Sequence, residues 1–185
     1  TIYLSFLGAG LLLLLPRRGT QWARLIALAI ALGGLGVALA AAWGYDAGGD
    51  VATVSRHSWI PTLGIEYHLA ADGISLTLVL LTGLMAVVGI LFSWNIERQP
   101  KQFFALFLTL IGGVYGVFLS FDLFLLFVFY EIAIIPKYFL IAIWGSTRKE
   151  YGAMKLVLYS FGGSALVLVG LIATYVVAGA KTVIW

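Results

Sequence analysis

The chain alternates long apolar runs with short polar stretches, and the run lengths predict membrane-spanning helices. Five runs are close to the roughly 20 residues that cross a bilayer, and they cover 22–43, 74–94, 103–120, 123–144 and 153–177. An earlier run, 2–15, is shorter, and the basic residues Arg17 and Arg18 follow it, which is unlike a signal peptide. We expect an all-α integral membrane protein of about six transmembrane helices in one domain, the first helix clipped and the chain a segment of something longer.

The longest polar stretch, 44–71, is predicted to be an outer loop. Val51–Val54 and Gly64–Leu69 alternate weakly around Pro61, which favours a short β-hairpin. The loop also holds both histidines, His57 and His68, and we expect them to be surface side chains.

Local signals predict where two helices begin and where others pack closely. Asp72 and Asp122 each precede an apolar run, where a carboxylate can accept hydrogen bonds from the free N–H groups of the first turn. Small residues allow helices to approach one another in a membrane, and the glycines expected to do so are Gly33, Gly34, Gly36, Gly112, Gly113 and Gly116.

Basic residues are distributed unevenly, which predicts the orientation. Eight of the 11 lysines and arginines lie at the turns after the first, third and fifth runs: Arg17, Arg18, Arg24, Arg98, Lys101, Arg148, Lys149 and Lys155. Arg56 and Lys181 lie on the opposite side. The positive-inside rule puts the basic turns in the cytoplasm and both chain ends outside. This asymmetry explains the net charge of +3 without a nucleic-acid partner.

Composition narrows the function further. With 62% hydrophobic and 10% charged residues, the chain is not a soluble domain. The absence of cysteine excludes disulfides and thiolate metal sites, and the positions of the histidines exclude a histidine metal site inside the membrane. No nucleophile–base pair or phosphate-binding glycine loop is present, so we expect the chain to bind no cofactor.

Glu131 is the most informative residue, because it lies inside an apolar run. It is eight residues into 123–144, about 12 Å deep at about 1.5 Å per residue. A charge at the bilayer centre costs about 2.5–3.5 kcal/mol even on lenient scales. The carboxyl is therefore protonated, paired or facing internal water. A proton relay and a neutral, hydrogen-bonded structural role both satisfy this requirement.

Three nearby residues have two interpretations each. Pro136 frees a backbone carbonyl, which either binds water beside Glu131 or only marks a packing kink. Lys137 follows Glu131 by six residues, about 120° around the helix, so it is either an indirect charge partner or a lysine that snorkels to the surface. Lys155 is either a cytoplasmic anchor or a weaker candidate for transport.

Two stretches resemble a known family. They are WIPTLGIEYHLAADGIS, residues 59–75, and GVFLSFDLFLLFVFYEIAIIPKYFLIAIWG, residues 116–145; AMKLVLY, residues 153–159, also fits. The chain resembles the antiporter-like membrane subunit (chain M) of respiratory complex I, the proton-translocating NADH:quinone oxidoreductase. The likeness extends over about 55–178. Lys137 departs from it, because the family has an apolar residue there.

The resemblance implies a fold of about fourteen helices, with two inverted five-helix repeats, of which this chain would supply the first six. It implies that Glu131 is the essential carboxylate, acting with a lysine on the seventh helix beyond Trp185. Electron transfer through FMN, iron–sulfur clusters and quinone would occur elsewhere in the complex and drive proton pumping. The expected partners are the other membrane-arm subunits and lipid, in a prokaryotic plasma membrane.

Two alternatives stay open. Multisubunit cation/proton antiporters and membrane-bound hydrogenases use similar chains, and the transported ion could be a proton or sodium. A purely structural membrane scaffold is the third hypothesis, and it predicts that Glu131 tolerates an apolar replacement.

Overall fold

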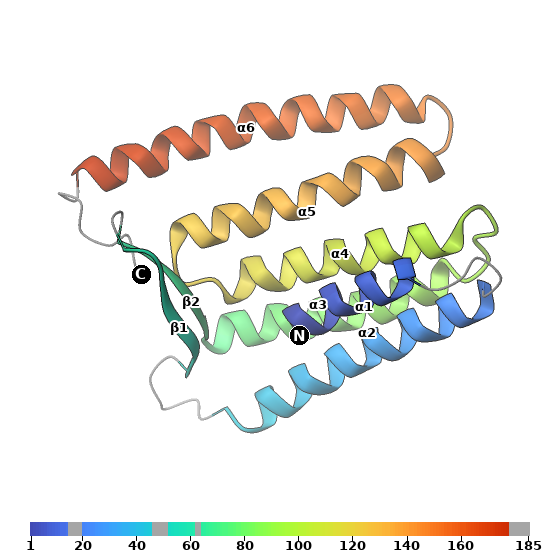
Figure 1. The fold of residues 1–185 in the computed structure, drawn as a ribbon, viewed down its shortest axis with the longest axis horizontal. Coiled ribbons are helices and arrows are strands. Elements are labelled where there is room, and N and C mark those ends of the chain that lie inside the picture. The colour runs from blue at the N-terminus through green and yellow to red at the C-terminus, as the bar shows by residue number, and fades with distance from the viewer. Residues whose placement is uncertain (15–19, 46–51, 62–63, 178–185) are drawn as a thin grey trace.

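A computed structural model describes residues 1–14, 20–45, 52–61 and 64–177. Six helices and one hairpin form in this part of the chain (Figure 1). The elements are α1 (Ile2–Leu14), α2 (Thr20–Trp43), β1 (Ala52–Ile60), β2 (Ile65–Ala71), α3 (Gly73–Phe92), α4 (Pro100–Leu119), α5 (Leu123–Trp144) and α6 (Lys149–Val177). The mostly helical fold predicted from the run lengths is confirmed.

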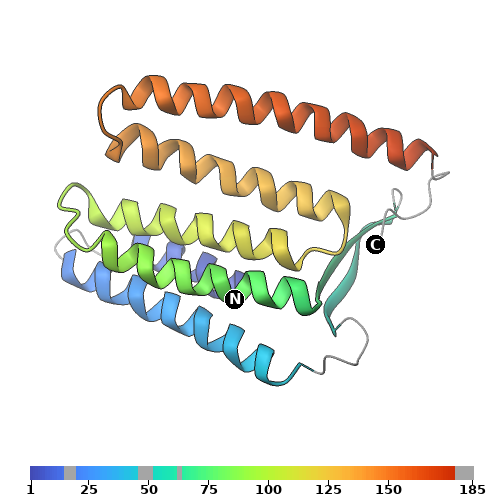
Figure 2. The ribbon, with the colours of Figure 1, turned by 180° about the vertical axis from the view of Figure 1, so that it is seen from behind.

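Five of these helices, α2 to α6, are long and apolar enough to cross a membrane. α1 has 13 residues, about 20 Å at the usual rise, which is less than the roughly 30 Å hydrocarbon layer. The hairpin lies at the end of the bundle where α5 begins and α6 ends, and the α3–α4 and α5–α6 turns lie at the other end (Figures 1 and 2). The basic residues Arg98, Arg148 and Lys149 therefore share one end, opposite the hairpin.

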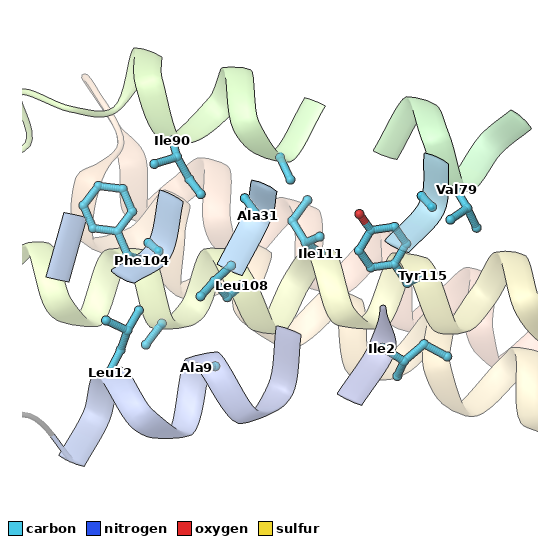
Figure 3. Packing of buried hydrophobic residues seen from close by; sticks show 14 of the residues in the cluster. Ile2, Ala9, Leu12, Ala31, Val79, Ile90, Phe104, Leu108, Ile111 and Tyr115 are labelled. Carbon is cyan, nitrogen blue, oxygen red and sulfur yellow. The ribbon is translucent and has the colours of Figure 1, made fainter. Parts of the chain in front are cut away.

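The hydrophobic core lies among the first four helices, around α4. Phe104 and Tyr115 of α4 belong to one buried cluster with Leu12 of α1 and Ile90 of α3, and Tyr115 lies at the end of the cluster near Val79 (Figure 3). α5 adds Leu125 and Phe129, and no described residue of α6 belongs to this cluster. α6 packs on α5 at the edge of the bundle, as both views show (Figures 1 and 2).

The glycines of α4 are close-packing positions, as predicted. Gly112 faces Phe6 of α1, and a methyl group on Gly113 would lie 3.0 Å from the Cβ of Ala133. A methyl group on Gly116 would overlap the ring of Phe129. α4 can therefore contact α1 and α5 at short range, which places α5 firmly against the core.

The glycines of α2 follow the prediction only in part. Gly33 approaches Leu4, and a methyl group on Gly34 would lie 3.4 Å from the hydroxyl of Tyr115. A methyl group on Gly36 would meet open space, so this position does not need a glycine for packing.

The hairpin is confirmed, but both strands are longer than the weak alternation predicted. β1 and β2 are antiparallel, with irregularities between Thr53 and Ser55 and between Ser58 and Ile60. Most β1 side chains are exposed, so its sequence has little period-two signal to detect. The Nε of Arg56 lies 2.6 Å from the carboxylate of Glu66 across the strands, and this hydrogen bond lowers the pKa of Glu66.

Three expectations need correction. The predicted run began at residue 103, but α4 begins at Pro100, because proline suits the first turn of a helix. The predicted run began at residue 153, but α6 begins at Lys149, because the polar residues before the run are also helical. Lys155 therefore lies in the second turn of α6, not the first.

The third correction is that His68 is not a surface residue. It is only 8% exposed, because its ring lies against Phe121 in the connection between α4 and α5, with 5.8 Å between ring centroids.

Candidate functional site: a buried carboxyl between α5 and α6

α5 lies between α4 and α6, and its two sides have different neighbours (Figures 1 and 2). Leu125, Phe129, Ala133 and Pro136 are buried on one side, where Phe129 and Ala133 contact the glycines of α4. α5 continues without a break through Pro136, whose ring is buried on this α4-facing side. The functional carboxyl predicted from the sequence belongs to the other side.

Glu131 lies on the side of α5 that faces α6. It follows Phe124 by seven residues and precedes Ile134 by three, so the three side chains share one face of the helix. Phe124 lines a cavity of about 290 Å³ together with Leu168 and Leu171 of α6, which identifies this face as the α6-facing one. Ile134 is only 5% exposed, although it points away from the core.

The Glu131 carboxyl has a buried oxygen without a partner. Its Oε1 atom is inaccessible to solvent and makes no hydrogen bond to the described residues. Within that part of the chain, Lys137 forms no ion pair with this carboxyl, because their charged atoms are more than 4.0 Å apart. A buried polar atom without a hydrogen bond costs roughly 1–3 kcal/mol. This arrangement therefore needs a water molecule or a further polar group.

The structure does not bring the three predicted site residues together. Lys137 is half-buried on α5, about 120° around the helix from Glu131. Lys155 is exposed on α6, with its Nζ 5.9 Å from the ring centroid of Tyr151 and 5.8 Å from that of Tyr159. Both distances are within the range of cation–π attraction. Lys155 thus has aromatic neighbours, and it forms no ion pair with a carboxylate of the described residues.

Asp122 positions the start of α5, as predicted for an N-cap. Its Oδ1 accepts hydrogen bonds from the backbone N–H groups of Phe124, at 2.9 Å, and Leu125, at 3.0 Å. Its Oδ2 accepts a third, at 3.3 Å, from Glu66 in β2. Asp122 is 2% exposed. The carboxylate therefore also links the hairpin to the helix that carries Glu131.

Asp72 is confirmed as the N-cap of α3. It accepts a 2.6 Å hydrogen bond from the backbone N–H of Ser75. Hydrogen bonding to Ser75 lowers the pKa of the Asp72 carboxyl, because the charged form is the better acceptor.

Among the buried polar side chains, Ser164 and His68 were not identified from the sequence. Ser164 of α6 is 5% exposed, and its hydroxyl has no hydrogen-bond partner among the described residues. Both ring nitrogens of His68 are likewise buried and unpaired within that part of the chain. A serine in an apolar run is a common residue with no distinctive spacing, and His68 lies in a stretch that reads as a polar loop. Neither residue could be singled out without knowing which element covers it.

Comparison with known proteins decides the family. NAD(P)H-quinone oxidoreductase chain 4 1 of Synechococcus sp. (strain JA-3-3Ab) is 40% identical over 174 residues, which cover 93% of this chain and 33% of the relative. NAD(P)H-quinone oxidoreductase chain 4 of Gloeobacter violaceus is 36% identical over 133 residues, or 72% of this chain and 25% of the relative. Residues 120–184 match the family described as NADH:quinone oxidoreductase/Mrp antiporter, TM. The chain belongs to this antiporter-like membrane-subunit family.

Solved structures show that the antiporter-like fold is shared. Respiratory complex I from Thermus thermophilus contains a chain with a TM-score of 0.84 and 23% identity, aligned over 99% of this chain and 37% of that one. The Mrp complex from Dietzia sp. DQ12-45-1b gives a TM-score of 0.82 at 20% identity, over 98% and 20% of the two chains. The antiporter-like chain is thus a multi-pass integral membrane protein, and it spans about a third of the length of the curated relatives it matches.

Proposed function

We propose that this antiporter-like chain is part of a proton-translocating membrane subunit of an NAD(P)H:quinone oxidoreductase. The observation that carries the proposal is the buried, unpaired carboxyl oxygen of Glu131 inside a membrane-spanning helix. Ionisable residues within membrane spans are expensive to bury and typically mark ion pathways. The identity to NAD(P)H-quinone oxidoreductase chain 4 supports this reaction class.

Glu131 is proposed to act as a proton switch. A carboxylate among apolar helices is costly unless a cation or water compensates its charge. Movement of a cationic group toward or away from the carboxyl therefore changes its preferred charge state, and a proton is taken up or released. Lys137 and the lysine expected on a seventh helix are the candidate cations, and Lys155 is a weaker one.

Redox chemistry is assigned to other subunits in this proposal. Groups of three or more potential metal ligands do not occur among the described residues. FMN, iron–sulfur clusters and quinone would belong to the assembled complex, with this chain among its membrane-arm subunits. The chain contributes proton movement rather than electron transfer.

A cation/proton antiporter is the second candidate, because the Mrp complex contains a chain with a similar fold. The membrane-bound sulfane sulfur reductase also contains one, with a TM-score of 0.81 over 96% of this chain. The fold does not separate these reactions, so the composition of the purified complex would distinguish them. Co-purification of flavin and iron–sulfur subunits favours the oxidoreductase.

Replacing Glu131 with glutamine in the assembled complex tests the proposal. Glutamine keeps the size of the side chain but cannot exchange a proton, so we expect proton pumping by membrane vesicles to fall roughly 100-fold, the scale of a lost proton-transfer group. Quinone reduction by the same vesicles reports assembly and coupling. Glu150→Gln, at the exposed start of α6, is the matched control. Normal pumping by Glu131→Gln would rule the proton switch out.

A further inference from the structure

Two buried polar atoms lie without partners on neighbouring helices. One is Oε1 of Glu131 on α5, and the other is Oγ of Ser164 on α6. They are not hydrogen-bonded to each other or to any other described residue. Two unpaired groups beside each other are far less costly if something polar lies between them, because each then regains a hydrogen bond.

The register of α5 against α6 places these atoms at a similar depth. At one end, Nζ of Lys149 donates a 3.0 Å hydrogen bond to the carbonyl of Ile143. At the other end, Phe124 and Leu168 line the same cavity. In the antiparallel pair that joins these points, Glu131 is level with the part of α6 that holds Phe161 and Ser164, two residues about 4.5 Å apart along the helix axis.

The direction of the glutamate side chain favours the level of Ser164. Side chains on a helix lean toward its N-terminus. The N-terminus of α5 is the hairpin end of the bundle (Figure 1), and α6 runs toward that same end. The carboxyl of Glu131 therefore extends from its own backbone toward the level of Ser164.

Both residues also lie on the faces where the two helices meet. On α6, Ala153, Ser160, Ser164, Leu171 and Tyr175 recur at helical spacing and are among the more buried positions of a mostly exposed helix. Leu171 and Tyr175 line the cavity that Phe124 of α5 also lines. Glu131 shares the face of Phe124, so the contact surface contains a carboxyl and a hydroxyl among hydrocarbon groups.

We propose that Ser164 is a positioning residue for Glu131, through a water molecule bound between α5 and α6. A serine hydroxyl donates one hydrogen bond and accepts others, and a carboxyl accepts in either charge state, so one water can bridge them. The bridge holds the carboxyl in one orientation and keeps it hydrated. The functional role of this bridge rests on the proposed role of Glu131. The presence of the bound water does not depend on that role.

Infrared difference spectroscopy on the assembled complex during turnover tests this inference. The Glu131 carboxyl band is identified by its loss in Glu131→Gln. We expect Ser164→Ala to shift that band and to remove a water O–H band sensitive to H₂¹⁸O. We also expect Ser164→Ala to lower proton pumping about fivefold, the scale of one lost hydrogen bond. Ser164→Thr keeps the hydroxyl and should restore all three signals.

Thr174→Val is the matched control, because Thr174 carries a hydroxyl on the same helix but is exposed, ten residues from Ser164, and already donates a hydrogen bond to the carbonyl of Gly170. An unchanged carboxyl band and normal pumping in Ser164→Ala would overturn the inference, even where Glu131→Gln abolishes pumping. Normal pumping in Glu131→Gln would instead overturn the proposed function. In that case the water band and its loss in Ser164→Ala would still support the bound water.

Discussion

At the scale of single residues, the carboxylate of Asp122 links the start of α5 to the hairpin. Its three hydrogen bonds satisfy two N–H groups at the start of α5 and one in β2. The N–H of Phe121 adds a 3.0 Å hydrogen bond to the carbonyl of His68, beside the bridge between Leu69 and Ser120. The position of α5, and hence of Glu131, therefore depends on polar contacts at the hairpin end.

We expect Asp122→Ala to lower the stability of the assembled subunit by about 1–2 kcal/mol, the usual cost of losing an N-cap, and more where the freed N–H groups stay buried. Thermal unfolding of the purified complex measures this change. Asp122→Asn keeps one acceptor oxygen and should be clearly milder. Equal losses for both variants would show that capping is not the main role of Asp122.

At the scale of elements, α4 and α5 approach closely because α4 presents glycines where α5 presents Ala133 and Phe129. Transmembrane helices gain no hydrophobic driving force from one another, so close van der Waals packing holds such pairs together. This contact orients α5 and leaves Glu131 on the side away from the core.

Gly116→Val should therefore destabilise the subunit by roughly 1–3 kcal/mol, the range for overpacking, because the new side chain would overlap the Phe129 ring. Gly162→Val on α6 is the control, because a methyl group there meets open space. Melting temperature and proton pumping are measured together. A melting temperature as high as that of the unchanged protein would contradict the close packing of α4 and α5.

At the scale of the whole molecule, the bundle has a basic end and a hairpin end. At the basic end, the α3–α4 turn is linked to other elements by two hydrogen bonds to its backbone carbonyls. Nη2 of Arg24 donates to the carbonyl of Ile96 at 3.0 Å, and Nε1 of Trp144 donates to that of Arg98 at 2.6 Å. The positive-inside rule predicts that this end faces the cytoplasm.

Single cysteines test this orientation, because the chain contains none of its own. Ser58 in the hairpin and Ser146 in the α5–α6 turn are both exposed. In intact cells, we expect a membrane-impermeant maleimide to label Ser58→Cys and to leave Ser146→Cys unlabelled until the membrane is opened. The opposite labelling pattern would reverse the orientation.

Much of the site could be predicted from sequence because its signals are local. Glu131 stands out in its apolar run, and Asp122 directly precedes the same run, so neither signal depends on distant residues. The function of Glu131, Lys137 and Lys155 stays a prediction. His68 and Ser164 could not be found in this way, because their burial depends on elements more than 20 residues away in the sequence.

The sequence by itself determined the membrane-spanning runs, the two aspartate caps, the glycine contacts of α4 and the family resemblance. These follow from run length, turn chemistry and residue size, which act over a few residues in an apolar solvent. Only the tertiary structure decided that the Glu131 carboxyl faces α6 and that Lys137 does not pair with it. A helix has several faces, and the neighbours that cover each face are set by long-range packing.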